Sequence, residues 1–142
     1  MANKIYTDKY LSSNFETGSR ATISASLCEK IISILSDAKT HLSNGDKVAW
    51  LQNLAKVPNE IGALMSIISI PELEEWGIEM QKYYLHISYI ISQIMSESLP
   101  SSSVDNIIQK LFETRDLWKS IEINYLEKSR DKAVFSGNEG LI

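Results

Sequence analysis

The segment from Val104 to Lys128 repeats its apolar residues at intervals of three, four and seven. This spacing places one apolar stripe along one face of an α-helix. Arg115 falls on the same stripe. Either its stem packs while its guanidinium reaches water, or it pairs with a carboxylate from a neighbouring helix. A helix with so broad an apolar face is not stable alone in water, so the rest of the chain must supply partners.

Three earlier segments repeat the helical period, at residues 22–42, 46–68 and 71–97. Asn44-Gly45-Asp46 predicts the turn between the first two. Pro58 predicts a kink in the second helix, and not a break, because the apolar phase continues across it. Four long helices with short connections predict an all-α fold, an antiparallel up-down four-helix bundle.

The ends of the chain are more polar than the helical segments. Residues 1–21 still contain aromatic side chains, which a disordered tail seldom does. We therefore expect a partly ordered N-terminal arm at 1–21, the four-helix bundle at 22–130, and a frayed C-terminal tail at 131–142.

Charge and hydropathy exclude two classes of partner. With 14 basic and 18 acidic residues the net charge is −4, and no basic stripe is present to follow a nucleic acid. No apolar run approaches the roughly 20 residues that span a bilayer, so we expect no membrane partner. The single cysteine and the absence of a signal-type apolar segment predict a cytoplasmic protein.

Chemistry-bearing residues are sparse. His41 and His86 do not follow the glutamate spacing of a di-iron bundle, and with Cys28 they do not make a zinc set. Cys28 lies among apolar residues, which favours a buried, inert thiol. Arg115 and Trp118 are interpreted as structural, with Trp118 as a partner anchor the alternative. We expect no catalytic residue, no metal, no cofactor and no enzyme activity.

The most distinctive feature is the apolar width of the third helical segment. Tyr83, Tyr84, Tyr89 and Ile90 widen its stripe beyond what one core face needs. Such extra width indicates burial on two sides or a surface kept for a partner.

Laid end to end, the four segments resemble the flagellin-specific export chaperone family, FliS. In the first, Glu29, Lys30, Leu35 and Asp37 agree with the family pattern, while Cys28, Ser36 and Ala38 replace its proline, tyrosine and glycine. The second segment agrees at Leu54, Lys56, Val57, Ile61 and Leu64. The fourth agrees best, over residues 111–118, and the third only loosely, at Tyr84-Leu85. The resemblance covers about residues 5–125 and indicates a divergent member.

The resemblance implies a cytoplasmic, non-enzymatic export chaperone that binds the disordered C-terminal segment of flagellin and prevents premature polymerisation. The client would fold into helices against apolar grooves on the bundle surface. The expected partner-binding residues are Tyr6, Tyr10, Ile61, Leu64, Met65, Ile68, Tyr83, Tyr84, Ile90 and Ile91. For each of the bundle residues among them, a place in the core is the alternative.

Two further hypotheses follow from this reading. Tyr6, Tyr10 and Phe15 would cover an empty groove until the client displaces them, so deleting residues 1–18 should tighten client binding or increase aggregation. The second class of function is a helical adaptor or regulator that acts by homodimerisation or by holding another protein. The two classes differ in what fills the apolar surface: a filament-protein peptide, or a second copy of this chain.

Overall fold

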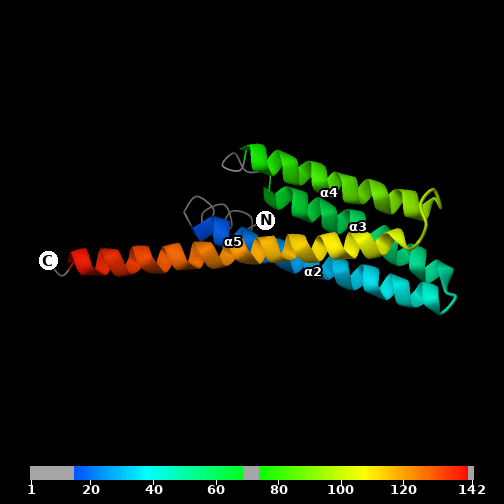
Figure 1. Ribbon diagram of the computed structural model, residues 1–142, viewed down its shortest axis with the longest axis horizontal. Coiled ribbons are helices and arrows are strands. Elements are labelled where there is room, and N and C mark those ends of the chain that lie inside the picture. Colours follow the sequence, from blue (N-terminus) through cyan, green and yellow to red (C-terminus); the bar gives the residue numbers. More distant parts are fainter. Residues whose placement is uncertain (1–14, 69–73, 141–142) are drawn as a thin grey trace, which may run out of the picture.

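The computed structural model describes the backbone of residues 15–68 and 74–140, and the side chains of residues 20–68 and 77–123. Within those ranges the chain forms four α-helices: α2 (Phe15–Ser43), α3 (Lys47–Ile68), α4 (Glu74–Met95) and α5 (Ser103–Gly140). They run up and down as an antiparallel bundle (Figure 1). The predicted all-α four-helix bundle is confirmed.

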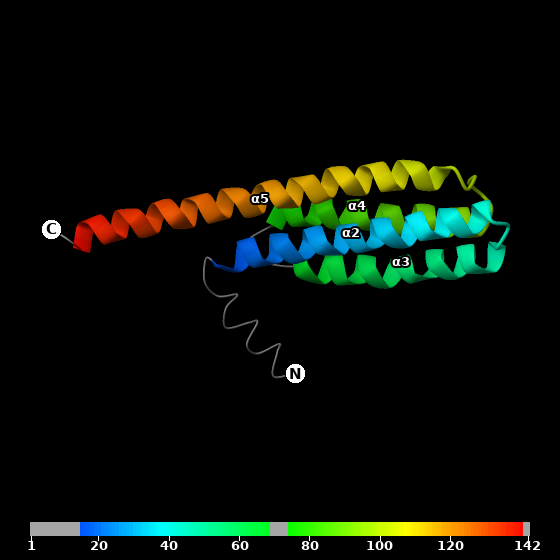
Figure 2. The same cartoon turned by 90° about the horizontal axis from the view of Figure 1, so that it is seen from below.

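The helices follow the order α5, α2, α3, α4 around the bundle. α2 packs extensively against α5 on one side and α3 on the other, and α3 also packs against α4 (Figure 2). α4 and α5 make the least extensive contact of these neighbouring pairs. The core fills the space between the helices. Its largest fully buried side chains include Ile31, Leu35, Leu54, Ile61, Tyr84, Ile91 and Leu111.

The turn between α2 and α3 forms where the sequence predicts it. Gly45 adopts a φ of 80°, which glycine tolerates without a Cβ clash. The Asp46 carboxylate accepts a hydrogen bond of 3.0 Å from the backbone amide of Ala49 and so caps the first turn of α3. The chain therefore reverses within a few residues, and α2 and α3 lie antiparallel.

α3 continues through Pro58 without a break. Leu54 and Ile61, on either side of the proline, are both buried, while Pro58 itself is exposed. The helix keeps its apolar face toward the core, which outweighs the one backbone hydrogen bond that proline removes.

At both ends, helices extend into the ranges that the sequence analysis assigned to an arm and a tail. α2 begins at Phe15, inside the range 1–21 expected to be an arm. Buried small side chains at Ala21, Ser24 and Ala25 allow α2 to pack closely from its early turns, which polarity alone does not reveal. The Arg20 guanidinium also donates a 2.6 Å hydrogen bond to the carbonyl of Ile67, in the last turn of α3, where a positive charge is favourable.

At the other end, α5 is helical as far as Gly140, although residues 131–142 were expected to fray. The turns before residue 133 contain good helix formers, including Leu126, Glu127, Lys128, Arg130 and Lys132, whereas the last two turns contain the weak helix formers Ser136, Gly137, Asn138 and Gly140. Helix propensity therefore accounts for the helix up to about residue 133 and not for its last turns. The C-terminal part of α5 projects beyond the other three helices (Figures 1 and 2).

Candidate functional site

The structure places half of the predicted partner-binding residues in the core. Ile61, Leu64, Ile68, Tyr84 and Ile91 are each at most 2% exposed. These five residues are core residues and do not form groove walls, so that part of the site prediction is corrected. The physical reason is that α3 packs against α2 and α4, and α4 packs against α3 and α5, so these faces are covered by neighbouring helices.

The other predicted residues lie at the edge of the core or outside the described part of the chain. Met65, Tyr83 and Ile90 are half-buried and pack against the core. Tyr6 and Tyr10 lie outside the described residues. The apolar surface available to a partner therefore consists of other residues, whose side chains are exposed.

The outer face of α4 carries an exposed apolar stripe of Ile78, Leu85 and Tyr89, called here the α4 stripe. These side chains are 53%, 56% and 58% exposed. Their spacing of seven and four places them on one face of the helix, turned away from buried Tyr84 and Ile91. The sequence indicated an apolar surplus on this helix. The signal that identifies its residues is a second i, i+7, i+11 series running opposite the core series.

Beside the α4 stripe, the seam between α4 and α5 contains a hollow of about 250 Å³. Its floor is apolar and includes Ile87 and Ile107, which are nearly fully buried. Exposed polar side chains form its rim. The complete lining is Tyr83, His86, Ile87, Ile90, Leu99, Ser103, Asn106, Ile107 and Lys110.

Further along the seam, aromatic hydroxyl groups join the two helices. The Trp118 indole Nε1 donates a 2.9 Å hydrogen bond to the Tyr84 hydroxyl in the buried interior. The Tyr83 hydroxyl lies 2.9 Å from Thr114 Oγ1, which also lies 2.8 Å from the Lys110 carbonyl oxygen. Since threonine has one hydroxyl hydrogen and the carbonyl can only accept, Tyr83 is the donor to Thr114. These bonds join the two helices on one side of the hollow, and Tyr83 takes part both in them and in the lining of the hollow.

Burial governs the ionisation of the groups behind the seam. Burial raises the pKa of the Cys28 thiol from its usual 9.0 to about 12, and a hydrogen bond with Tyr84 only partly opposes this shift. Burial also raises the pKa of the Tyr84 hydroxyl. A protonated, buried thiol is a poor nucleophile. The prediction that Cys28 is buried is confirmed, and Trp118 is likewise a core indole at 3% exposure.

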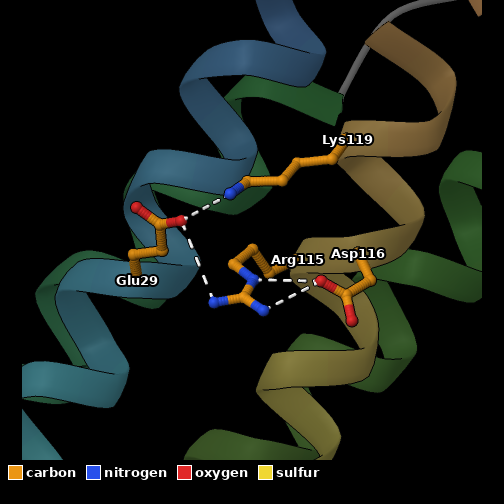
Figure 3. Close-up of polar contacts among 4 residues, drawn as sticks. All are labelled: Glu29, Arg115, Asp116 and Lys119. Carbon is orange, nitrogen blue, oxygen red and sulfur yellow. Dashed lines mark hydrogen bonds and ion pairs between the residues drawn. The ribbon is translucent and has the colours of Figure 1, made fainter. Parts of the chain in front are cut away.

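On the opposite side of α5, Arg115 lies in a group of four charged side chains (Figure 3). Its guanidinium bonds Asp116 at 2.9 Å and lies 4.0 Å from Glu29 of α2, which also pairs with Lys119 at 3.0 Å. The guanidinium carbon also stands 4.8 Å from the centre of the Phe112 ring. Arg115 combines the two alternatives: its close pair is with Asp116 of its own helix, and a longer ion pair reaches Glu29 of α2. The cluster holds α2 to α5 and offers no acid–base or nucleophilic pair.

Two features are absent from the part of the chain that the structure describes. No group of three or more His, Cys, Asp or Glu side chains there could hold a metal ion. None of the described helices combines the length and hydropathy needed to cross a membrane.

Comparison with protein-family models, with curated protein sequences and with solved structures finds no match to this chain.

Proposed function

We propose that this protein is a cytoplasmic, non-enzymatic export chaperone that binds the disordered C-terminal segment of flagellin, or of a flagellin-like filament protein. The client segment folds into helix on the outside of the bundle and is kept from polymerising until export. The observation that carries the proposal is the α4 stripe, where three large apolar side chains stand more than half exposed on one helix face.

Binding a disordered segment is favourable only if the apolar surface it buries offsets the free energy lost in ordering it. Large apolar side chains gain free energy when they leave water, at roughly 25 cal/mol per Å² of apolar area. A disordered client spends several kcal/mol of contact energy on ordering, so its binding surface must be broad and apolar. An amphipathic helix laid on α4 would meet Ile78, Leu85 and Tyr89 through its own i, i+4 and i+7 positions.

The resemblance of the helices to flagellin-specific export chaperones supports this choice of client. The matching residues at Glu29, Arg115 and Trp118 hold α2, α5 and the core together in this structure. They therefore support the fold that the resemblance implies, and the α4 stripe supplies the apolar surface.

The test is a titration of the full chain with the C-terminal segment of the host flagellin, by calorimetry at several temperatures and by circular dichroism. We expect a sub-micromolar Kd, a negative heat-capacity change and a gain of helix. Absence of binding would contradict the proposal. Leu85→Ser and Tyr89→Ser should weaken binding. Lys56→Ser should not, because Lys56 is exposed on α3, away from the α4 stripe.

The hypothesis about the N-terminal arm is tested in the same assay. Because α2 already begins at Phe15, the deletion should remove residues 1–14 and leave the helix intact. A tighter Kd or increased aggregation is expected if Tyr6 and Tyr10 cover the apolar surface. Unchanged affinity and solubility would count against that role.

A homodimeric adaptor is the second candidate, and the projecting end of α5 favours it. An isolated helical stretch of this length is marginal in water unless something packs against it. Ile123, near the start of this stretch, is 55% exposed. Light scattering distinguishes the two: a tight dimer that does not bind flagellin peptide would favour the adaptor.

A further inference from the structure

The α4–α5 seam differs from the α4 stripe because it combines an apolar hollow with charged side chains, basic at the hollow and acidic further along the seam. At the hollow, Lys110 and His86 stand exposed on opposite sides of the opening. Within residues 20–68 and 77–123, Lys110 has no ion-pair partner. Lys110 therefore leaves an exposed positive charge at the hollow, on a chain whose net charge is −4.

The size of the hollow sets what can enter it. Its volume of about 250 Å³ is below the roughly 300–1,000 Å³ of pockets that enclose whole small molecules. A single large apolar side chain fits that space better. The apolar floor at Ile87 and Ile107 would give such a side chain a dry contact.

The rest of the seam indicates how a partner helix that carries this side chain would lie. On α5, Asn106, Lys110 and Leu117 follow one another at intervals of four and seven, so they share one face of the helix. Leu117 is 43% exposed, two turns or about 10 Å beyond Lys110. A helix lying along the seam would reach the hollow, then Lys110, then Leu117.

Charge along the seam specifies the partner further. The hollow end carries Lys110 and the imidazole of His86, whereas the Leu117 end carries the exposed acids Glu113 and Glu79. Glu79 is within 3.4 Å of Lys82, so its charge is already partly balanced. The net positive end therefore attracts a carboxylate beside the anchoring side chain.

We infer that the seam between α4 and α5 is a docking site for an acidic amphipathic helix of a partner protein. One large apolar side chain of that helix fills the hollow, and a carboxylate one turn away from the anchor pairs with Lys110 and accepts a hydrogen bond from His86. A second apolar side chain, about two turns further, rests on Leu117. The inference does not require the partner to be flagellin.

The experiment uses a phage-displayed library of helical peptides of about 20 residues, selected on the full-length protein. The anchor position and the positions one and two turns away are randomised. We expect enrichment of aromatic or leucine side chains at the anchor, and of Asp or Glu one turn away. The affinity of the best peptide is then measured by fluorescence anisotropy. No enrichment, or enrichment without the acid, would overturn the inference.

Two variants make the test specific to the seam. Lys110→Glu should weaken the selected peptide at least tenfold, because it places like charges together. Asn106→Trp should block the hollow and remove binding, with the helix content by circular dichroism unchanged. Lys56→Glu is the matched control for net charge, since Lys56 is exposed on α3. Equal binding to the control and to Lys110→Glu would contradict the inference.

The flagellin segment is titrated against the same variants to keep this inference separate from the proposed function. Loss of the selected peptide alone in Lys110→Glu would leave the proposed function standing on the α4 stripe. Binding of the selected peptide by a chain that ignores flagellin would keep the seam and reject flagellin as client.

Discussion

Around α2 the neighbouring helices are joined by core packing and by ion pairs, whereas α4 and α5 are joined by aromatic hydroxyl groups. Lys30 pairs with Glu60 of α3 at 3.0 Å, and Lys39 pairs with Asp105 of α5. Across the described part of the α4–α5 seam, the polar links are instead Tyr83 to Thr114 and Tyr84 to Trp118.

This difference shows how one bundle can pack its helices extensively on one side and leave a binding surface on the other. α4 and α5 pack less extensively than the other neighbouring pairs, and the hollow lies between them with Tyr83 as part of its lining. Binding surfaces are commonly drawn from regions with few buried contacts, because those regions adjust at low cost. The α4 stripe and the seam both lie on this side of the molecule.

The largest predicted effect is the loss of a buried leucine side chain, and the loss of an exposed leucine serves as its comparison. Leu111 is fully buried in the core, whereas Leu85 is 56% exposed on the α4 stripe. Leu111→Ala should lower the free energy of unfolding by about 3 kcal/mol, through lost apolar burial and a residual cavity. Leu85→Ala should change it by no more than about 0.5 kcal/mol. Urea unfolding measures both, and similar losses would contradict the assignment of the two sides.

The buried hydrogen bond of the seam gives the next effect. Tyr84→Phe removes the acceptor of the Trp118 indole and should lower the free energy of unfolding by about 2 kcal/mol. Tyr83→Phe removes a bond at a half-buried position and should cost about 0.5 kcal/mol, because Thr114 keeps its bond to the Lys110 carbonyl. Chemical denaturation of the matched pair tests this order. A larger loss for Tyr83→Phe would mean that the outer bond, and not the buried one, joins the helices.

Alkaline pH should weaken the fold through Cys28. The pKa of this thiol is raised to about 12 in the folded protein, so the folded state holds the proton more tightly than the unfolded state does. The contribution is fully present below pH 9 and is lost as the pH rises toward 12. Within that window unfolding releases the thiol proton, so stability falls steadily as the pH rises.

Denaturation at closely spaced pH values checks this prediction, with Cys28→Ala as the comparison. The variant should lose less stability between pH 9 and pH 10. Above that range Tyr84 adds a loss of the same sign in both proteins, because its pKa is raised from 10.0. Equal pH dependence of both proteins from pH 9 would show that the thiol is not protected by burial.

The smallest effect is expected at the charged cluster on the α2 side. Arg115→Ala should cost about 1 kcal/mol, since the guanidinium pairs with Asp116 and stands over the Phe112 ring. Lys119→Ala should cost a few tenths of a kcal/mol, because its pair with Glu29 is about half exposed. Both losses should shrink in 1 M salt, most clearly for Lys119. Salt-independent losses would indicate packing in place of charge pairing.

Sequence periodicity was sufficient for the four helices and their up-down arrangement, because each core face repeats at helical spacing. It also located the turn at Gly45 and the uninterrupted passage through Pro58. Helix ends were less predictable. The start of α2 depends on small buried residues such as Ala21 and Ala25, whose value is visible only once neighbouring helices approach them.

The candidate site was the least predictable part. A broad apolar face on α4 indicates extra width, but it does not say which neighbours cover which edge. Tyr84 and Ile91 proved to be core, while Ile78 and Leu85 proved to be surface. The hollow depends on the separation of α4 and α5, which is a property of packing and not of either helix alone.

The central claim is that the α4 side of the bundle is the binding surface. Hydrogen–deuterium exchange of the full chain, with and without the flagellin C-terminal segment, tests it most directly. We predict slower exchange of amides along α4 and in the facing turns of α5 from Ser103 to Leu117, with α2 and the middle of α3 unchanged. Slower exchange confined to α2 and α3, or no change anywhere at saturating peptide, would contradict the claim.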